Sequence, residues 1–152
     1  TKYDDWDKQQ ARNKNKFMQM EHIWGYGFFK RAYEIVAPFM EGYYAMIPDD
    51  YRGRPHEHIL NYCDQYGMAP GKVVTSQDSV LSGFLAVNNL IKVSTFTMNA
   101  KYIGEWGEHS NSDHYKENWK PYEPFNEMVT DFTWDDKIKE KIRTLCKAKF
   151  LK

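Results

Sequence analysis

The apolar stretch between residues 80 and 91 constrains the fold more than any other part of this sequence. Its apolar residues, which recur at helical spacing, are Val80, Leu81, Phe84, Leu85, Val87, Leu90 and Ile91. Just before it, Thr75-Ser76-Gln77-Asp78 offers a helix N-cap with an acidic residue three places on. A helix that is apolar over most of its circumference is usually surrounded by other elements. The sequence therefore predicts a central helix in which Phe84 and Val87 are nearly inaccessible.

The same region is the best candidate for a membrane span, but its composition argues against one. Between residues 79 and 99 the only charged residue is Lys92, yet asparagines, serines and threonines are interspersed throughout. A transmembrane helix needs about 20 predominantly apolar residues, because polar side chains are costly in hydrocarbon. We therefore expect a buried helix and no transmembrane span.

Two segments before this stretch also have helical periodicity. Residues 4–37 begin with acidic residues, which favour a helix N-terminus, and end before Pro38, which disfavours helical geometry in the preceding residue. Glycines in the middle of the segment allow two helices, and a short helix over residues 39–47 follows the proline. The apolar stripe of the first segment is Phe17, Met20, Trp24, Phe28 and Ile35. The second segment, residues 55–66, has Pro55 at its first turn and Gly67 at its end.

The last predicted helix begins with Thr133 as its N-cap. Acidic residues follow in its first turn and lysines lie toward its end, as the helix dipole favours. Its inward stripe is predicted to be Ile138, Ile142 and Leu145, extended by Phe150. The basic residues expected on its outer surface are Lys137, Lys141, Arg143, Lys147 and Lys149.

These elements predict a mainly α fold. The chain of 152 residues is near the common size of one domain, and we expect a single-domain bundle of four or five helices. Residues 1–103 would form the helical body, residues 104–124 a long polar and aromatic arm, and residues 125–152 the basic C-terminal helix. The alternative is an α+β fold, in which a strand over residues 93–96 pairs with Val73 and Val74.

The whole chain has no net charge, but acidic and basic residues occupy separate segments near its end. Lysine and arginine total 21, as do aspartate and glutamate, which argues against a protein that grips nucleic acid over its whole face. Residues 105–136 hold nine acidic and two basic residues, a net charge of −7, whereas residues 137–152 hold seven basic and one acidic, a net charge of +6. Either the two segments neutralise each other, or the basic helix docks on an acidic protein partner, a lipid surface or RNA.

Cysteine usage and the first residues indicate the compartment. Cys63 and Cys146 lie 83 positions apart, with no CxxC pair, so we expect two free thiols in intracellular, reducing surroundings. One disulfide between them is the alternative. The polar, acidic start of the chain, Thr1 to Trp6, is not expected to hold a secretory signal peptide.

The sequence has no catalytic signature that we can identify. It lacks the GxGxxG, P-loop and GxSxG patterns. His56-Glu57-His58 begins like the zinc-protease motif HExxH, but Leu60 stands where the second histidine is required. We expect no cofactor; the alternative is zinc or another divalent ion in the loop over residues 109–114. The ligands there would be His109, Asp113 and His114.

Aromatic residues are abundant in segments that we expect to be loops. Trp119, Tyr122 and Phe125 are separated by prolines and must bury their area against the helices or against a partner. The other candidate contacts with protein subunits are Lys141, Lys147 and Lys149. The sequence thus predicts a non-enzymatic interaction or structural subunit of a larger protein assembly. The alternative function is a small metal-dependent enzyme or metal-binding domain that uses residues 109–114.

Metal analysis of the purified protein separates these two functions. We expect no stoichiometric zinc, because three ligands from one polar loop fall short of the four that a structural zinc site requires. A bound zinc ion would instead hold nitrogen or oxygen atoms of His109, Asp113 and His114 at about 2.0–2.2 Å. Stoichiometric zinc that disappears with His109→Ala would overturn the preference for a non-enzyme.

Overall fold

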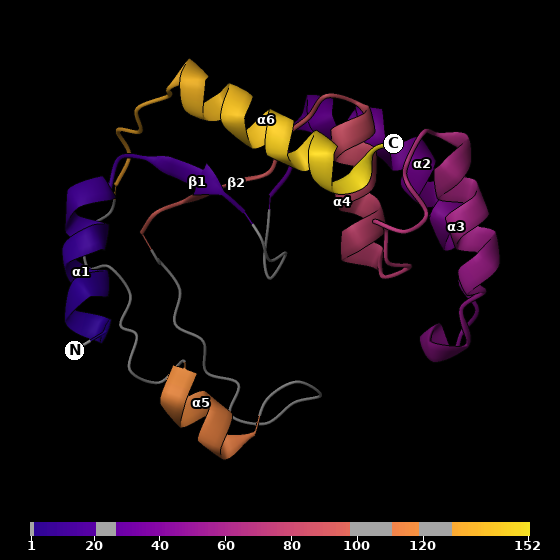
Figure 1. Ribbon diagram of the computed structural model, residues 1–152, viewed down its shortest axis with the longest axis horizontal. Coiled ribbons are helices and arrows are strands. Elements are labelled where there is room, and N and C mark those ends of the chain that lie inside the picture. Colours follow the sequence, from indigo (N-terminus) through magenta and orange to yellow (C-terminus); the bar gives the residue numbers. More distant parts are fainter. Residues whose placement is uncertain (1, 21–26, 98–110, 119–128) are drawn as a thin grey trace. The chain divides into compact units, whose positions relative to one another are not determined.

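The computed structural model describes residues 2–20, 27–97, 111–118 and 129–152, and these are mainly helical (Figure 1). Six α-helices and a two-stranded sheet lie among them, which confirms the predicted mainly α fold class. The chain divides into two compact units: residues 1–18 with residues 94–134, and residues 19–93 with residues 135–152. The expectation of one domain for the whole chain stays a prediction.

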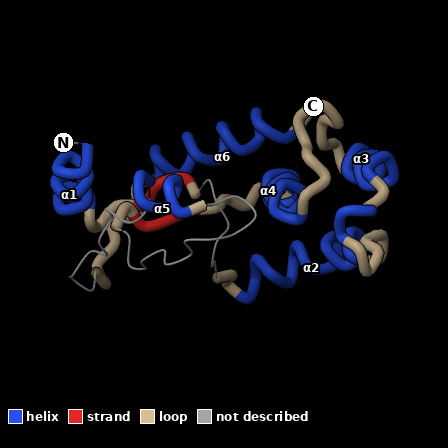
Figure 2. Tube along the Cα trace, turned by 90° about the horizontal axis from the view of Figure 1, so that it is seen from below, coloured by secondary structure: helices blue, strands red, loops and turns tan. Residues whose placement is uncertain are grey.

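The hydrophobic core lies in the unit formed by residues 19–93 and 135–152. Its helical elements are α2 (Lys30–Tyr44), the 3₁₀ turn η1 (Tyr51–Gly53), α3 (His56–Gln65), α4 (Gln77–Val87) and α6 (Asp136–Phe150). α4 packs against α6 and α2, and Figure 2 shows it nearly end-on between these two helices. Every residue from Val80 to Ala86 is buried. The predicted central helix is therefore confirmed.

Phe84 is the centre of the aromatic packing around α4. Its side chain is fully inaccessible, and the ring centroids of Phe39, Tyr66 and Tyr62 lie 4.9, 5.4 and 5.7 Å from its own. Val87, by contrast, is half-buried instead of nearly inaccessible. It is the last residue of α4 and packs at the edge of the core.

The same helix has a glycine, Gly83, where it packs against Met68 of the chain after α3. A Cβ atom at Gly83 would lie 2.5 Å from the sulfur of Met68, which is itself fully buried. Interiors are packed as densely as organic crystals, so a contact this short requires the sulfur to move. Gly83 thus sets how closely α4 approaches Met68.

α2 runs through Pro38 instead of ending before it. The fixed backbone angle of proline suits a helix, and the local cost comes from the missing N–H and crowding with the preceding turn. Val36 and Met40, two residues to either side, are both buried in the core, and we attribute the continuity of the helix to this burial. The predicted boundary at residue 37 is wrong. So is the single helical stripe from Phe17 to Ile35, because Phe17 lies in a strand.

The start of α6 also differs from the prediction. Its N-cap is Asp135, whose carboxylate accepts a hydrogen bond from the backbone N–H of Lys137 at 2.8 Å. Thr133 is not the cap; its backbone N–H instead donates to the carbonyl of Asn15 at 2.8 Å. Asp135 and Thr133 are both good capping residues, so local preference alone could not separate them.

The buried face of α6 is rotated from the predicted one. It comprises Ile142, Cys146 and Phe150, at a constant spacing of four, and Leu145 is 47% exposed. The predicted inward position of Leu145 is therefore wrong, and Ile138 is only half-buried. Cysteine behaves as a small hydrophobe, so Cys146 can take the inward place that the pattern gave to leucine. Arg143 is not on the outer surface either, since its side chain is 19% exposed.

In its described residues the other unit holds two helices and contributes to the small sheet. The elements are α1 (Lys2–Asn13), β1 (Phe17–Gln19), β2 (Val93–Thr95) and α5 (Ser112–Asn118), and the division between the units falls within both strands. Met20 N–H donates to Lys92 O and Phe96 N–H to Lys16 O, so the strands are antiparallel. The strand of the α+β alternative is present, but its partner is β1 and not residues 73–74.

The predicted loop over residues 104–124 contains a helix. α5 covers seven of its residues, with Asp113 in the first turn and Lys116 in the last, where the helix dipole favours each charge. The predicted continuous loop is therefore wrong at these residues. Residues 104–110 and 119–124 of that segment, and Trp24 of the predicted N-terminal stripe, lie outside the described residues.

The helices of the described residues are too short or too polar to cross a bilayer. α4 is apolar but has only 11 residues, about half the length that a span requires.

Replacing Phe84 with alanine should lower the free energy of unfolding by about 3–5 kcal/mol, the range for truncating a buried aromatic side chain. Urea denaturation followed by circular dichroism measures the loss. Leu145→Ala is the matched control, and because Leu145 is 47% exposed it should cost less than about 1 kcal/mol. A similarly small loss for Phe84→Ala would contradict the central position of α4.

Candidate interaction surfaces

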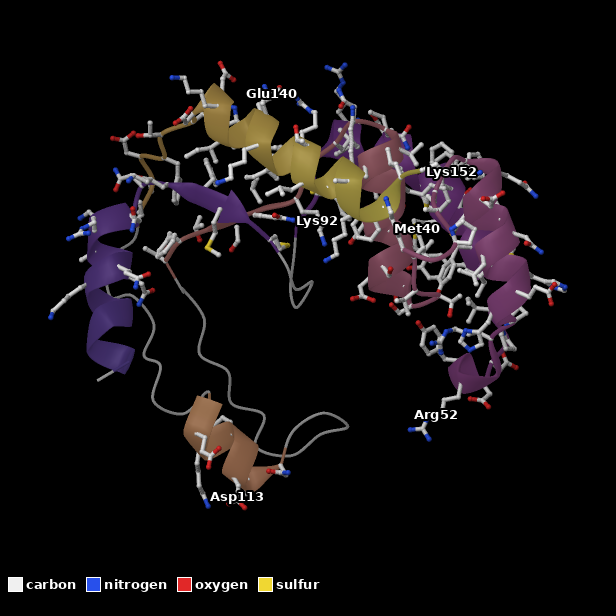
Figure 3. The ribbon with its side chains drawn as sticks, viewed as in Figure 1. Met40, Arg52, Lys92, Asp113, Glu140 and Lys152 are labelled. Carbon is white, nitrogen blue, oxygen red and sulfur yellow. The ribbon has the colours of Figure 1, made fainter. Side chains whose placement is uncertain are left out.

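The structure describes only part of the sequence-predicted sites. Residues outside its description are His109, Trp119, Tyr122 and Phe125. Asp113 is exposed on α5 (Figure 3), and His114 lies in the same helix without a described side chain. No three histidine, cysteine, aspartate or glutamate side chains converge within the described ranges as a metal site requires. Because His109 and the side chain of His114 lie outside the described residues, the alternative of a zinc site is not tested.

Lys141, Lys147 and Lys149 are all exposed on α6, but the helix does not bring them to one face. At about 100° per residue, Lys141 and Lys147 project roughly 120° apart around the axis. Lys141 and Lys149 instead flank Leu145, with one helical turn between successive residues. We call Lys141, Leu145 and Lys149 the α6 stripe.

A second surface, which the sequence analysis missed, lies where α2, η1 and the start of α4 meet. Tyr44 and Tyr51 are 48% and 40% exposed, and Val74 is 63% exposed. Gln77 binds both tyrosine hydroxyls: its Nε2 donates to Tyr44 Oη at 2.6 Å, and its backbone N–H donates to Tyr51 Oη at 3.0 Å. We call Tyr44, Tyr51, Arg54, Val74 and Gln77 the tyrosine surface.

Arg54 holds Tyr51 in place. Its guanidinium carbon lies 4.5 Å from the centre of the Tyr51 ring, and its Nη1 donates to the Tyr51 carbonyl at 3.2 Å. Its Nε donates to Thr75 Oγ1 at 3.2 Å, and His56 Nδ1 lies 2.6 Å from the same oxygen. A cation over an aromatic face is attracted to it, and the two hydrogen bonds fix the cation. The Tyr51 ring is therefore restrained by its surroundings before any partner binds.

Tyr43 connects the tyrosine surface to the core. It is fully buried, its hydroxyl donates to the carbonyl of Thr75 at 3.1 Å, and its oxygen lies 3.4 Å from Tyr51 Oη. Burial, and then the hydrogen bond with Tyr51, raise the pKa of Tyr43 well above that of an ordinary tyrosine. Tyr43 thus stays protonated and can keep donating at neutral pH.

A partial signal for this surface was present in the sequence. Tyr51 and Arg54 lie in a short segment between two prolines, and tyrosine and arginine are enriched at binding hot spots. The decisive contact is not local, because Gln77 lies 33 residues after Tyr44. Tyr43 follows the buried Val36 and Met40 at helical spacing, so periodicity could have indicated that Tyr43 is buried and Tyr44 exposed.

A polar cluster at α4 and α6 contains a serine, a lysine and a cysteine. Lys92 Nζ donates to Ser82 Oγ at 2.7 Å, and Ser82 donates in turn to the carbonyl of Asp78 at 2.6 Å. Ser82 is 4% exposed, so its hydroxyl is closed to a substrate. Figure 3 shows Lys92 beside α6, where Gln19 Nε2 lies 3.9 Å from the sulfur of Cys146. These contacts satisfy polar groups in the core.

Burial makes both cysteine thiols harder to deprotonate. It raises the pKa of the fully inaccessible Cys63 thiol to about 11. It also raises the pKa of the Cys146 thiol, although the ammonium groups of Lys92 and Lys149 act in the opposite direction. A thiol with a raised pKa is a poor nucleophile at neutral pH. Both thiols are free, so the alternative of a disulfide between them is wrong.

Comparison with known proteins found no relative: no protein-family model, no curated protein and no solved structure matches this chain. Its function has to be inferred from the chemistry of the tyrosine surface and the α6 stripe.

The buried Cys63 thiol predicts a loss of stability at alkaline pH. Because its folded-state pKa of about 11 exceeds the ordinary value of about 8.5, the folded protein binds this proton more tightly than the unfolded chain does. The resulting stabilisation is complete below about pH 8.5 and is lost as the pH rises toward 11. The free energy of unfolding in urea should therefore fall between about pH 8 and pH 10, and less so in Cys63→Ala. Equal pH dependence in the two proteins would contradict this assignment.

Proposed function

We propose that this chain is a non-enzymatic interaction subunit of a larger protein assembly. The observation that carries the proposal is the tyrosine surface, where two partly exposed rings are held by hydrogen bonds to α4. Tyrosine and arginine are enriched among the residues that dominate binding energy at protein interfaces. A ring that is already held in place loses little conformational freedom when a partner covers it.

A single exposed tyrosine is ordinary on a monomer. Tyr33, for example, is 57% exposed on α2, with its ring edge-on to Phe28 at 6.3 Å. Tyr44 and Tyr51 differ because both hydroxyls are bonded within the fold, so each ring can be covered without leaving its hydroxyl unpaired. Val74 directly precedes Thr75, whose carbonyl binds the Tyr43 hydroxyl, and adds exposed apolar area. A partner would thus gain apolar burial at a low polar cost.

The partners are proposed to be other protein subunits in an intracellular compartment. Two free thiols, Cys63 and Cys146, support this location, because proteins exposed to oxidising surroundings commonly pair their cysteines.

Substitution of the two rings tests the proposal. Tyr44→Ala with Tyr51→Ala should weaken the assembly by at least about 30-fold, since losing a hot-spot side chain costs about 2 kcal/mol or more. The measurement is the native mass of the complex that contains each tagged variant, isolated from the natural source. Tyr51→Phe keeps the ring and should retain the assembly, which separates ring contact from the hydroxyl network.

Tyr33→Ala is the matched control, because it removes an exposed tyrosine from α2 outside the tyrosine surface. It should leave the native mass unchanged. A wild-type chain that is monomeric at its natural concentration would contradict the proposed function, as would an assembly that tolerates loss of both rings.

A further inference from the structure

The segment over residues 137–152 carries positive charge that its ion pairs do not neutralise. Its paired bases are Lys139 with Asp136, Arg143 with Glu140, and Lys152 with Asp64. In the described part of the chain, no acidic group lies within ion-pair distance of the other four bases, all of which are exposed. These four are Lys137, Lys141, Lys147 and Lys149. Within the described residues, four positive charges on α6 are therefore left without an ion pair.

Two of these charges flank an exposed apolar side chain. Lys141 and Lys149 stand one turn before and one turn after Leu145, which is 47% exposed. The helix cannot rotate to bury Leu145 without exposing Ile142 and Cys146, which are held in the core against α4. The α6 stripe is consequently a fixed alternation of positive, apolar and positive groups.

We propose that the α6 stripe docks an acidic segment of a partner protein that carries an apolar side chain between two carboxylates. The carboxylates would meet Lys141 and Lys149, and the apolar side chain would cover Leu145. This inference rests on the proposed role as an interaction subunit, but it concerns a different surface and adds the chemistry of the partner. Complementary charge would speed association, and burial of Leu145 would slow dissociation.

The stripe fits an acidic protein better than a membrane. A helix that lies in a bilayer interface buries a broad apolar face in the lipid. On α6 that face is already used, because Ile142, Cys146 and Phe150 are all buried in the core. Leu145 is the one large apolar side chain exposed on α6, so a lipid surface would gain little beyond the attraction of charge.

The stripe also fits an acidic protein better than RNA. Proteins that bind single-stranded RNA combine positive charge with aromatic side chains on which bases stack. The one aromatic residue of α6 is Phe150, which is buried, and its one arginine is paired with Glu140. Exposed lysines on either side of a leucine, without an accessible aromatic ring, therefore favour carboxylates as partners.

A titration with three kinds of probe tests the inference. The first probe is a fluorescent helical peptide with one leucine between glutamates one turn before and one turn after it, and a second peptide replaces that leucine with serine. The others are phosphatidylcholine vesicles containing phosphatidylserine, and poly(U) RNA. We expect the leucine peptide to bind the full chain more tightly than the serine peptide does, and to lose affinity with added salt.

Variants of the stripe give the sharper result. Leu145→Ser should weaken the leucine peptide about tenfold, and Lys141→Glu with Lys149→Glu should weaken it about 100-fold, chiefly through the association rate. Lys8→Glu with Lys116→Glu makes the same change in net charge at exposed lysines of α1 and α5, and should retain binding. Circular dichroism and urea unfolding check that each variant folds, which exposed positions should allow.

Several outcomes would overturn the inference. These are no binding of the leucine peptide, equal loss in the control variant, equal affinity for the serine peptide, or tighter binding of vesicles or RNA through the same lysines. The variant Tyr44→Ala with Tyr51→Ala should bind the leucine peptide as the wild type does. If the leucine peptide does not bind but the assembly is intact, only this inference is overturned. If the peptide binds but the chain forms no assembly, the proposed function is overturned.

Discussion

Burial of α4 is the interaction on which the described core depends. Its buried run from Val80 to Ala86 leaves no face for solvent, so the helix is stable only when other elements surround it. α2 and α6 pack against it, and Tyr62 of α3 reaches the ring of Phe84. Each surrounding helix therefore has its inward face fixed by one partner. The outward faces, including both interaction surfaces, follow from that choice.

Hydrogen bonds satisfy the polar groups of α4, both at its first turn and within its buried part. Gln77, at its first turn, contributes a backbone N–H to Tyr51 and a side chain to Tyr44, so a helix terminus and two exposed rings satisfy each other. Further along, Lys92 and the carbonyl of Asp78 satisfy the buried hydroxyl of Ser82. Burying these groups unpaired would cost free energy. The hydrogen bonds that stabilise the core thus also restrain the tyrosine surface.

Sequence reasoning succeeded where one local signal was strong. The apolar run before Ile91 predicted the central helix, and Gly67, with a φ of 82°, follows the C-cap of α3 as expected. It failed where tertiary contacts chose between similar local options, as between Leu145 and Cys146 on α6, or where burial outweighed a local cost, as at Pro38. The tyrosine surface could not be predicted, because it depends on contacts between residues distant in the chain.

The α6 stripe and the tyrosine surface would contribute to binding through different physical effects. Charges on the α6 stripe would attract the proposed partner over roughly a Debye length, about 8 Å at physiological salt, and so would act mainly on association. The rings of the tyrosine surface would act only on contact, and covering them would slow dissociation of the proposed partner. Because α2 and α6 both pack on α4, the two surfaces belong to one unit. Added salt should therefore weaken binding at the stripe while leaving ring contacts nearly unchanged, which makes salt dependence the property that assigns a given partner to one surface or the other.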